Sequence, residues 1–170
     1  LWWLILNIII LNVRPRKSAK LYESIWTDKG SPLLVNMQSI VEKLQSKNKD
    51  VHIKLGMRYG NPSIEEALNY FKNKNIFKIL VLPLYPQAGS PTNSSTFDEI
   101  SRVLNGWPWL PNLRFVNGYH DHEDYILAVS NSIKKSTSNC DDIEKIIFSF
   151  HGMPVRYLNE GDPYYCFCHK

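Results

Sequence analysis

The spacing of short apolar runs is the feature that most constrains the fold of this 170-residue chain. Each run is long enough for one β-strand, and the stretches between runs carry apolar residues at helical spacing. Strands that alternate with helices of about a dozen residues predict βαβ units, and hence a parallel sheet in a doubly wound α/β sandwich of three layers. The predicted strands cover residues 51–57, 76–84, 113–116 and 146–150.

Helix-start signals locate the segments between these strands. Ser63 and Glu66 match a capping box, in which each side chain bonds the backbone N–H of the other residue. Thr96, with Glu99 at the reciprocal position, is predicted to cap another helix in the same way. Further helices are predicted over residues 18–26, 33–48 and 125–135.

Polar and aromatic residues stand where each predicted strand ends. In open parallel sheets the ligand crevice lies outside the carboxyl ends of the strands, so these residues are expected at one edge of the sheet. The sequence has no Gly-x-Gly-x-x-Gly, Gly-x-x-x-x-Gly-Lys or Gly-x-Ser-x-Gly motif, so the usual signals for nucleotide binding and serine hydrolysis are missing. The strand-end residues are Arg58 and Tyr59, Tyr85 with Pro86 and Gln87, Tyr119 with His120, and His151.

Charge and cysteine content narrow the class of protein. The net charge is +4, with Lys and Arg scattered among acids, which argues against nucleic-acid binding. The three cysteines are too few for a disulfide scaffold and favour a reducing, cytoplasmic compartment. Cys166, Cys168 and His169 lack the spacing of a zinc finger or of haem attachment.

The length of the chain suits one domain, or one domain with part of another.

Residues 1–13 are almost wholly apolar and precede a basic stretch at residues 14–17. The run is shorter than the roughly 20 residues that cross a bilayer, and a signal peptide would carry its basic residues first. Because no Met opens the sequence, we expect it to begin inside a longer protein. Two interpretations stay open: a buried helix, or an apolar lip beside a hydrophobic ligand site that contacts a membrane surface.

The last predicted strand leads into the most specific motif of the chain, Ser149-x-His151-Gly-x-Pro154, with Gly-Asp-Pro-Tyr at residues 161–164. This block resembles the signature of the ferrochelatases, which insert ferrous iron into porphyrin. The finer details are most similar to bacterial enzymes that use protoporphyrin. Further blocks at family spacing lie at residues 21–33, 56–60, 82–87, 97–99 and 119–126.

The resemblance implies two similar α/β domains of the chelatase type, with porphyrin held in the cleft between them. Residues 1–143 are then expected to form the first domain without its first strand, and residues 144–170 the start of the second. The implied reaction is insertion of Fe2+ into protoporphyrin IX to give protohaem, a lyase step in the cytoplasm or peripherally at the inner membrane. Iron and porphyrin are its substrates, and no prosthetic group is expected.

By the resemblance, His151 is the catalytic residue and a metal ligand. An imidazole with an ordinary pKa of about 6.5 accepts a proton near neutral pH and also suits ferrous iron, so the roles of base and ligand both stay open. Tyr59 and Tyr85 offer aromatic faces to a flat ring, and Arg58 offers a partner to a propionate. Ordinary packing at a strand end is the alternative for each of these three residues.

Two features depart from the family pattern. The loop at residues 88–94 lacks the aromatic residue and the Ser-x-Ser-Thr run that usually follow Gln87. The acidic residue that faces the histidine across the porphyrin is expected beyond residue 170. Two alternatives therefore stay open: a porphyrin- or haem-binding fragment without catalysis, and a chelatase for another tetrapyrrole or metal.

Overall fold

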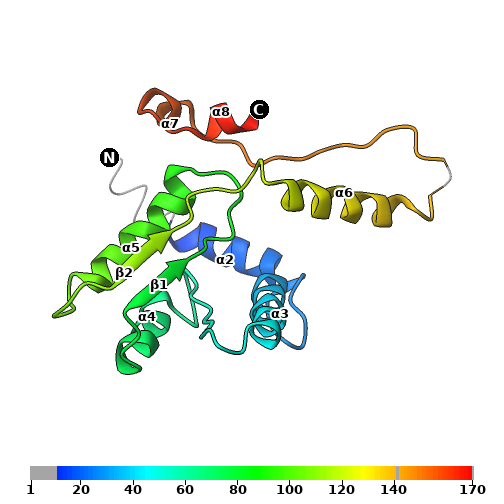
Figure 1. Ribbon diagram of the computed structural model, residues 1–170. Helices are drawn as coiled ribbons and strands as arrows, with labels where there is room; N and C mark the ends of the chain where they lie inside the picture. The colour runs from blue at the N-terminus through cyan, green and yellow to red at the C-terminus, as the bar shows by residue number, and fades with distance from the viewer. Residues whose placement is uncertain (1–10, 141, 170) are drawn as a thin grey trace, which may run out of the picture. The chain divides into compact units, whose positions relative to one another are not determined.

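The structure is a computed structural model that describes residues 11–140 and 142–169 (Figure 1). The chain divides into two compact units, residues 1–55 and residues 56–170. The prediction for residues 1–10 lies outside the described residues. The predicted domain boundary between residues 143 and 144 stays a prediction.

The described part of the first unit consists of helix α2, Leu11–Glu23, and helix α3, Pro32–Lys47. Helix α3 follows the predicted range closely, because Ser31 accepts a hydrogen bond from the Leu34 N–H at 3.2 Å and Pro32 opens the first turn. Helix α2 starts earlier than predicted. Gly30, with φ +110°, turns the chain between the two helices, in a conformation that favours glycine.

Helix α4, Ile64–Asn73, opens the second unit as the capping box predicts. The Ser63 hydroxyl accepts from the Glu66 N–H at 3.1 Å, and the Glu66 carboxylate accepts from the Ser63 N–H at 2.8 Å. Both bonds satisfy backbone donors that the first helical turn leaves unpaired. The apolar face of α4 contributes Ile64 and Leu68 to the core.

A βαβ unit follows, with strand β1 at Lys78–Val81, helix α5 at Ser95–Leu104 and strand β2 at Asn112–Phe115. The strands pair in parallel, with Lys78 opposite Asn112 and Val81 opposite Phe115. The prediction of an α/β fold with a parallel sheet is therefore confirmed at this coarse level. The core joins both helices to the sheet and comprises Ile64, Leu68, Ile79, Ile100, Val103 and Leu104.

The sheet buries only one face within this unit. Alternate side chains of β1, Ile79 and Val81, pack toward α4 and α5, whereas Leu80 between them is 66% exposed. What the described unit forms is a helix layer on one face of a two-stranded sheet. The predicted three-layer sandwich would need a further layer over Leu80, and the described residues do not confirm it.

The start of α5 differs from the prediction. A single turn of π-helix, η2 at Ser90–Ser94, runs directly into α5. Thr96 thus lies inside the helix, where its hydroxyl donates to the Thr92 carbonyl at 3.0 Å. Glu99 accepts from Arg102 instead of a cap N–H. The prediction that Thr96 caps this helix is wrong. Because η2 runs directly into α5, the N–H groups at this position have backbone carbonyl partners in the preceding turn and need no side-chain cap.

Two predicted strands do not form among the described residues. Residues 51–56 form no regular structure, and of the predicted strand only Met57 forms a bridge, to Ser63. Residues 146–150 likewise have no regular structure, and Ile147 is 92% and Phe150 76% exposed. A strand requires a neighbouring backbone to pair with, which an apolar pattern alone does not supply.

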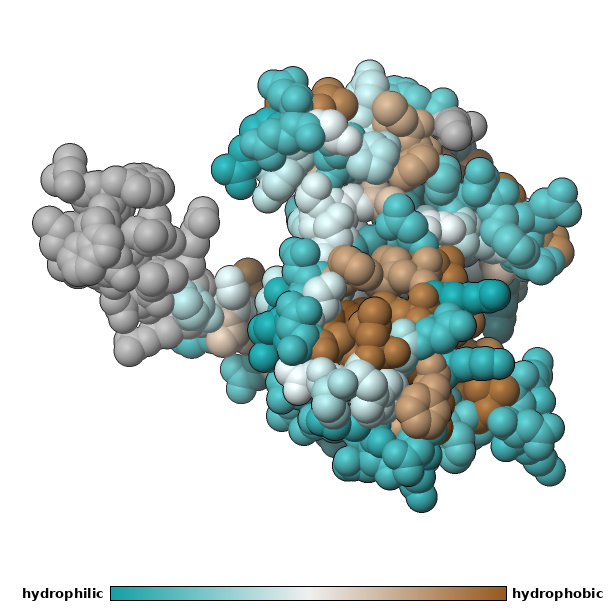
Figure 2. Space-filling view, turned by 60° about the vertical axis from the view of Figure 1, so that its left-hand side comes forward, coloured by the Kyte–Doolittle hydropathy of each residue, from teal (hydrophilic) through white to brown (hydrophobic). Residues whose placement is uncertain are grey.

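Helix α6, Glu123–Thr137, matches the predicted helix at residues 125–135, and two short helices follow, α7 at Val155–Asn159 and α8 at Tyr164–Cys168. Apolar side chains remain on the surface amid mostly hydrophilic ones, as Figure 2 shows for one face. No helix within the described residues is both long and apolar enough to cross a membrane. The cysteines Cys140, Cys166 and Cys168 are exposed free thiols.

Candidate functional site

The segments that follow β1 and β2 meet at one edge of the sheet, as the strand-end argument predicts. The Val116 N–H donates to the Val81 carbonyl at 3.0 Å, which continues the sheet pairing by one step. The Tyr119 N–H then donates to the Pro86 carbonyl at 2.9 Å. Gly118 passes so close that a Cβ there would lie 3.2 Å from the Pro86 oxygen. We call the joined segments, residues 85–94 and 117–120, the strand-end edge.

Asn93 fixes the far end of the β1 loop to this edge. Its side chain is 1% exposed, and its amide donates to the Asn117 carbonyl. The loop is also closed on itself, because the Gly89 carbonyl accepts from the Thr92 hydroxyl at 3.1 Å and from the Ser94 N–H at 3.3 Å. The loop at residues 88–94 is therefore an ordered part of the edge.

A third segment, which contains α8, joins the strand-end edge through Asp162. Its buried carboxylate accepts hydrogen bonds from the Ser90 N–H at 2.6 Å and the Tyr164 N–H at 2.8 Å. Burial raises the pKa of Asp162, but the hydrogen bonds from Ser90 and Tyr164 lower it more, so the net pKa lies below the ordinary value. Asp162 is therefore held as a carboxylate.

His120 completes the contact with α8. Its imidazole lies 4.4 Å from the Phe167 ring, measured between centroids. Both ring nitrogens of His120, together with Oδ1 of Asn93, are buried and have no hydrogen-bond partner among the described residues. Neither Asn93 nor Asp162 was among the predicted site residues. The Gly-Asp-Pro sequence at residues 161–163 is a turn signal that points to Asp162, because Asp side chains commonly bond backbone N–H groups in turns.

Arg58 is anchored on the first turn of α5. Its Nε donates to the Ser95 carbonyl at 2.9 Å and the Ser95 hydroxyl at 3.0 Å. Its Nη1 lies 3.9 Å from a Glu99 carboxylate oxygen, and its guanidinium stacks 4.7 Å from the centre of the Tyr59 ring. The structure therefore brings two predicted site residues, Arg58 and Tyr59, into contact. The Tyr59 side chain is 75% exposed.

Tyr85 and His151 lie in different settings. Tyr85, next to Pro86 in the strand-end edge, is 41% exposed. His151 is exposed, and its Nδ1 lies 2.8 Å from the Gly152 carbonyl oxygen. Among the described residues no hydrogen bond, ion pair or ring contact joins His151 to Arg58, Tyr59 or Tyr85, so the structure does not assemble these four into one constellation.

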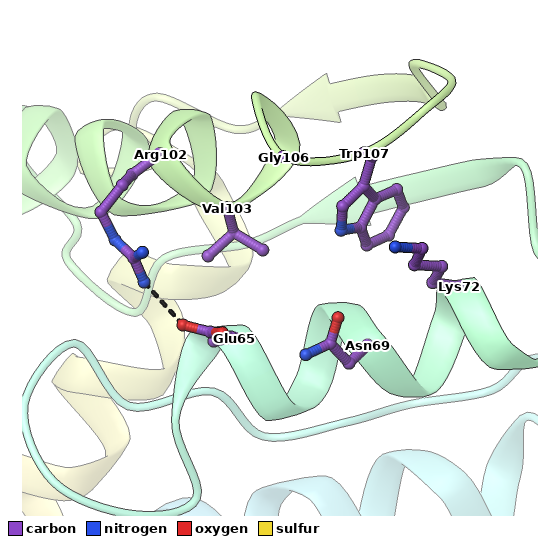
Figure 3. A pocket seen from close by; sticks show the side chains of 7 residues that line it. All are labelled: Glu65, Asn69, Lys72, Arg102, Val103, Gly106 and Trp107. Atoms are coloured by element: carbon purple, nitrogen blue, oxygen red, sulfur yellow. Dashed lines mark hydrogen bonds and ion pairs between the residues drawn. The ribbon is translucent and has the colours of Figure 1, made fainter.

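A separate pocket of about 280 Å³ lies between α4 and α5 and holds none of the predicted site residues (Figure 3). Arg102 closes one side of it by bonding Glu65 at 2.6 Å and Glu99 at 2.8 Å. On another side the Lys72 ammonium lies 5.5 Å from the Trp107 ring centre. Its charged side chains thus contact partners within the pocket wall: Arg102 pairs with Glu65 of α4, and Lys72 of α4 contacts Trp107 after α5.

The described residues contain no group of three His, Cys, Asp or Glu side chains placed to hold a metal ion. The contacts define an α/β protein whose candidate site is an edge of loops that follow parallel strands, with the His151 segment joined to it through Asp162.

Comparison with known proteins names the family. Residues 1–170 match the family described as Ferrochelatase, and the chain belongs to the ferrochelatase family. It is 50% identical to "Ferrochelatase" of Thioalkalivibrio sulfidiphilus, over 99% of this chain and 47% of that protein. It is 47% identical to "Ferrochelatase" of Nitrosococcus oceani, over 100% of this chain and 47% of that protein. It is also 47% identical to "Ferrochelatase 2" of Shewanella oneidensis, over 100% of this chain and 53% of that protein. The chain thus spans about half the length of the curated relatives it matches.

Proposed function

We propose that the whole protein inserts Fe2+ into protoporphyrin IX and releases protohaem, the lyase reaction of haem biosynthesis. The observation that carries this proposal is the family match over residues 1–170, which includes the block from Ser149 to Pro154. Relatives named Ferrochelatase at 43–50% identity support it. Ferrous iron and the porphyrin are both substrates of the reaction.

His151 is the proposed catalytic and metal-binding residue. Insertion requires that two pyrrole protons leave the macrocycle and that iron exchange water for ring nitrogens. With Nδ1 2.8 Å from the Gly152 carbonyl, the neutral imidazole donates its N–H there and keeps the lone pair on Nε2. An Nε2 lone pair on an exposed ring suits both removal of a proton and a transient bond to iron.

Arg58, Tyr59 and Tyr85 are the proposed porphyrin-binding residues. Tyr59 and Tyr85 expose aromatic faces, which suit the stacking of a flat apolar ring. Ser95 accepts hydrogen bonds from Nε of Arg58 and so restrains this side chain. The restraint limits the positions that the two terminal guanidinium nitrogens can reach. A bidentate contact with a propionate would use those nitrogens and replace the distant Glu99 interaction at 3.9 Å.

We further propose the finer architecture that the family resemblance implies. The first domain, residues 1–143, is a three-layer sandwich in the whole protein, and residues 144–170 begin the second domain. Residues 146–150 then form a strand, which would bury the apolar side chains of Ile147 and Phe150 and bring His151 to a strand end. The apolar run at residues 1–13 is the proposed contact with a membrane surface, and the cytoplasm is the proposed compartment.

A second candidate applies to this chain on its own, namely porphyrin binding without metal insertion. The exposed run at residues 146–150 favours it, because His151 has no formed strand to hold it against the other site residues. A chelatase for another tetrapyrrole is the third candidate, and the altered loop at residues 88–94 is the feature behind it.

The test compares the whole protein with this chain, using protoporphyrin and either Zn2+ or Fe2+. We expect the whole protein to give a Soret shift on binding and metalloporphyrin on turnover. For this chain alone we expect the Soret shift without turnover. Absence of metal insertion by the whole protein would contradict the proposed reaction. Preference for a different tetrapyrrole in direct competition would favour the third candidate.

A further inference from the structure

Asp162 joins two segments that are far apart in the sequence. One carboxylate oxygen accepts from the Ser90 N–H at 2.6 Å, and the other accepts from the Tyr164 N–H at 2.8 Å. The side chain is 7% exposed, so water does not compete freely for these bonds. A buried carboxylate that accepts backbone N–H groups makes charge-assisted hydrogen bonds, which are stronger than those between neutral groups.

The loop that Asp162 holds is fixed at its other end by Asn93. Its buried amide donates to the Asn117 carbonyl beyond β2. Close packing supports the Asp162 end, since a Cβ at Gly89 would lie 3.6 Å from the Tyr164 ring and 3.7 Å from Asp162 Oδ1. The loop at residues 88–94 therefore has two anchors, one on the segment that follows β2 and one on the segment that follows His151.

Resting on the proposed function, we propose that Asp162 is a positioning residue that locks the loop at residues 88–94 to the segment containing His151. The family resemblance implies that this loop helps to line the porphyrin site, and in the proposed function the segment carries His151, which handles protons and iron. Asp162 touches neither substrate and acts through Ser90 and Tyr164. Its loss should therefore weaken porphyrin capture and leave the affinity for the metal unchanged.

Asp162→Asn is the first variant, made in the whole protein. The amide keeps the size of the carboxylate but has one acceptor oxygen, so its NH2 group must face one of the two N–H donors. We expect the KM for protoporphyrin to rise roughly tenfold, the loss of one hydrogen bond to a charged group, with the KM for Zn2+ unchanged. Asp50→Asn, which alters an exposed carboxylate in the other unit, is the matched control and should leave both values unchanged.

A second variant removes the donor and leaves Asp162 in place. Ser90→Pro lacks the N–H that bonds the carboxylate, and Gly89, at φ −171° and ψ 155°, already has the extended conformation that a following proline requires. Ser90→Ala keeps the N–H and removes only the hydroxyl, which also contributes to the lowered pKa of Asp162, so the difference between the two variants isolates the N–H. We expect the proline variant to raise the KM for porphyrin as Asp162→Asn does, and the alanine variant to raise it less.

Hydrogen exchange gives a readout that does not depend on activity. In the whole protein, the N–H that faces the NH2 group in Asp162→Asn, that of Ser90 or that of Tyr164, loses its bond and should exchange at least about tenfold faster than in wild type. The other N–H keeps a bond to a neutral oxygen and should exchange faster by a smaller factor. Unchanged exchange at both amides together with an unchanged porphyrin KM would overturn the role of Asp162. If the wild-type protein inserts no metal, the proposed function fails, and the exchange measurement alone then decides whether Asp162 locks the loop.

Discussion

The βαβ unit and the segment around His151 both contain apolar runs, but only the βαβ unit buries them. Ile79 in β1 and Ile100 in α5 are buried in one core, whereas Ile147 and Phe150 ahead of His151 project into solvent. The first region carries its own partners, because β1 and β2 flank α5 in one βαβ unit and pair with each other. The second region has an apolar strand pattern but pairs with no strand among residues 11–140 and 142–169. The comparison teaches that the strand-end edge finds its partners within the described unit, although they are far apart in the sequence, whereas the run ahead of His151 finds no strand partner there.

The largest expected effect tests burial directly. Ile100→Ala, at a side chain 2% exposed, should lower the free energy of unfolding of this chain by about 3 kcal/mol, the cost of a cavity in a core. Ile147→Ala should change it by less than ~0.5 kcal/mol, because that side chain is already in water. Urea unfolding followed by circular dichroism measures both. Equal losses in the two variants would break the comparison.

The cost of Ile147→Ala in the whole protein tests whether residues 146–150 are buried there. If residues 146–150 form a strand there, as we propose, the substitution should cost about 2 kcal/mol, since the side chain is then buried. Urea unfolding of the whole protein is the measurement, with Ile100→Ala as the reference. A cost as small as in this chain would contradict the proposed strand.

The next effect in size concerns the cap of α4. Ser63→Ala removes the hydroxyl that accepts from the Glu66 N–H and should cost about 1 kcal/mol. Ser132→Ala, in the middle of α6, is the control for loss of a helical serine hydroxyl and should not destabilise the chain. Thermal unfolding of the two variants side by side checks the difference. If Ser132→Ala destabilises the chain as much as Ser63→Ala does, loss of the cap is not the cause of the destabilisation.

A smaller, pH-dependent effect belongs to Asp162. Because the pKa of its carboxyl is lowered by folding, its contribution to stability is present above the ordinary pKa of about 3.9 and is lost as pH falls through the lower folded value. The stability difference between wild type and Asp162→Asn should therefore be constant near pH 7 and shrink below about pH 4. Unfolding curves between these pH values measure it. A difference that grows on acidification would mean the opposite sign of the pKa shift.

The smallest expected effect is that of the Arg102 ion pairs. Arg102 contacts Glu65 and Glu99, but its side chain is largely exposed, so water and salt screen the attraction. Arg102→Ala should destabilise less than Ser63→Ala, and the loss should diminish further in about 1 M salt, where charges are screened within a few ångströms. Salt-independent destabilisation would show that packing in the pocket, and not charge, is what Arg102 provides.

Much of the α/β unit could be predicted because its signals are local. The capping box at Ser63 lies within one helical turn, and the strand pattern around Ile79 found its partner in β2. The start of α5 could not be predicted from Thr96, because the π-turn before it depends on how Gly89 and Asn93 are held by other segments. Local chemistry thus identified the helices, and non-local contacts set their boundaries.

The candidate site was predicted less completely. Strand-end position identified the meeting of Pro86 with Tyr119 at one edge of the sheet. It did not identify Asp162, whose partner Ser90 lies far away in the sequence and is reached only after the chain has folded. Strands were predicted at residues 51–57 and 146–150 and do not form among the described residues, because an apolar pattern does not specify the strand that it pairs with.

Metal insertion by the whole protein, measured for wild type and His151→Ala, tests the central claim most directly. We expect wild type to convert protoporphyrin and Zn2+ into zinc protoporphyrin, and the variant to be slower by at least ~100-fold, the range for loss of a general base. His52→Ala, which removes an exposed imidazole from the first unit, should retain wild-type activity. A His151→Ala protein with the wild-type rate would contradict the assignment of the chemistry to this histidine.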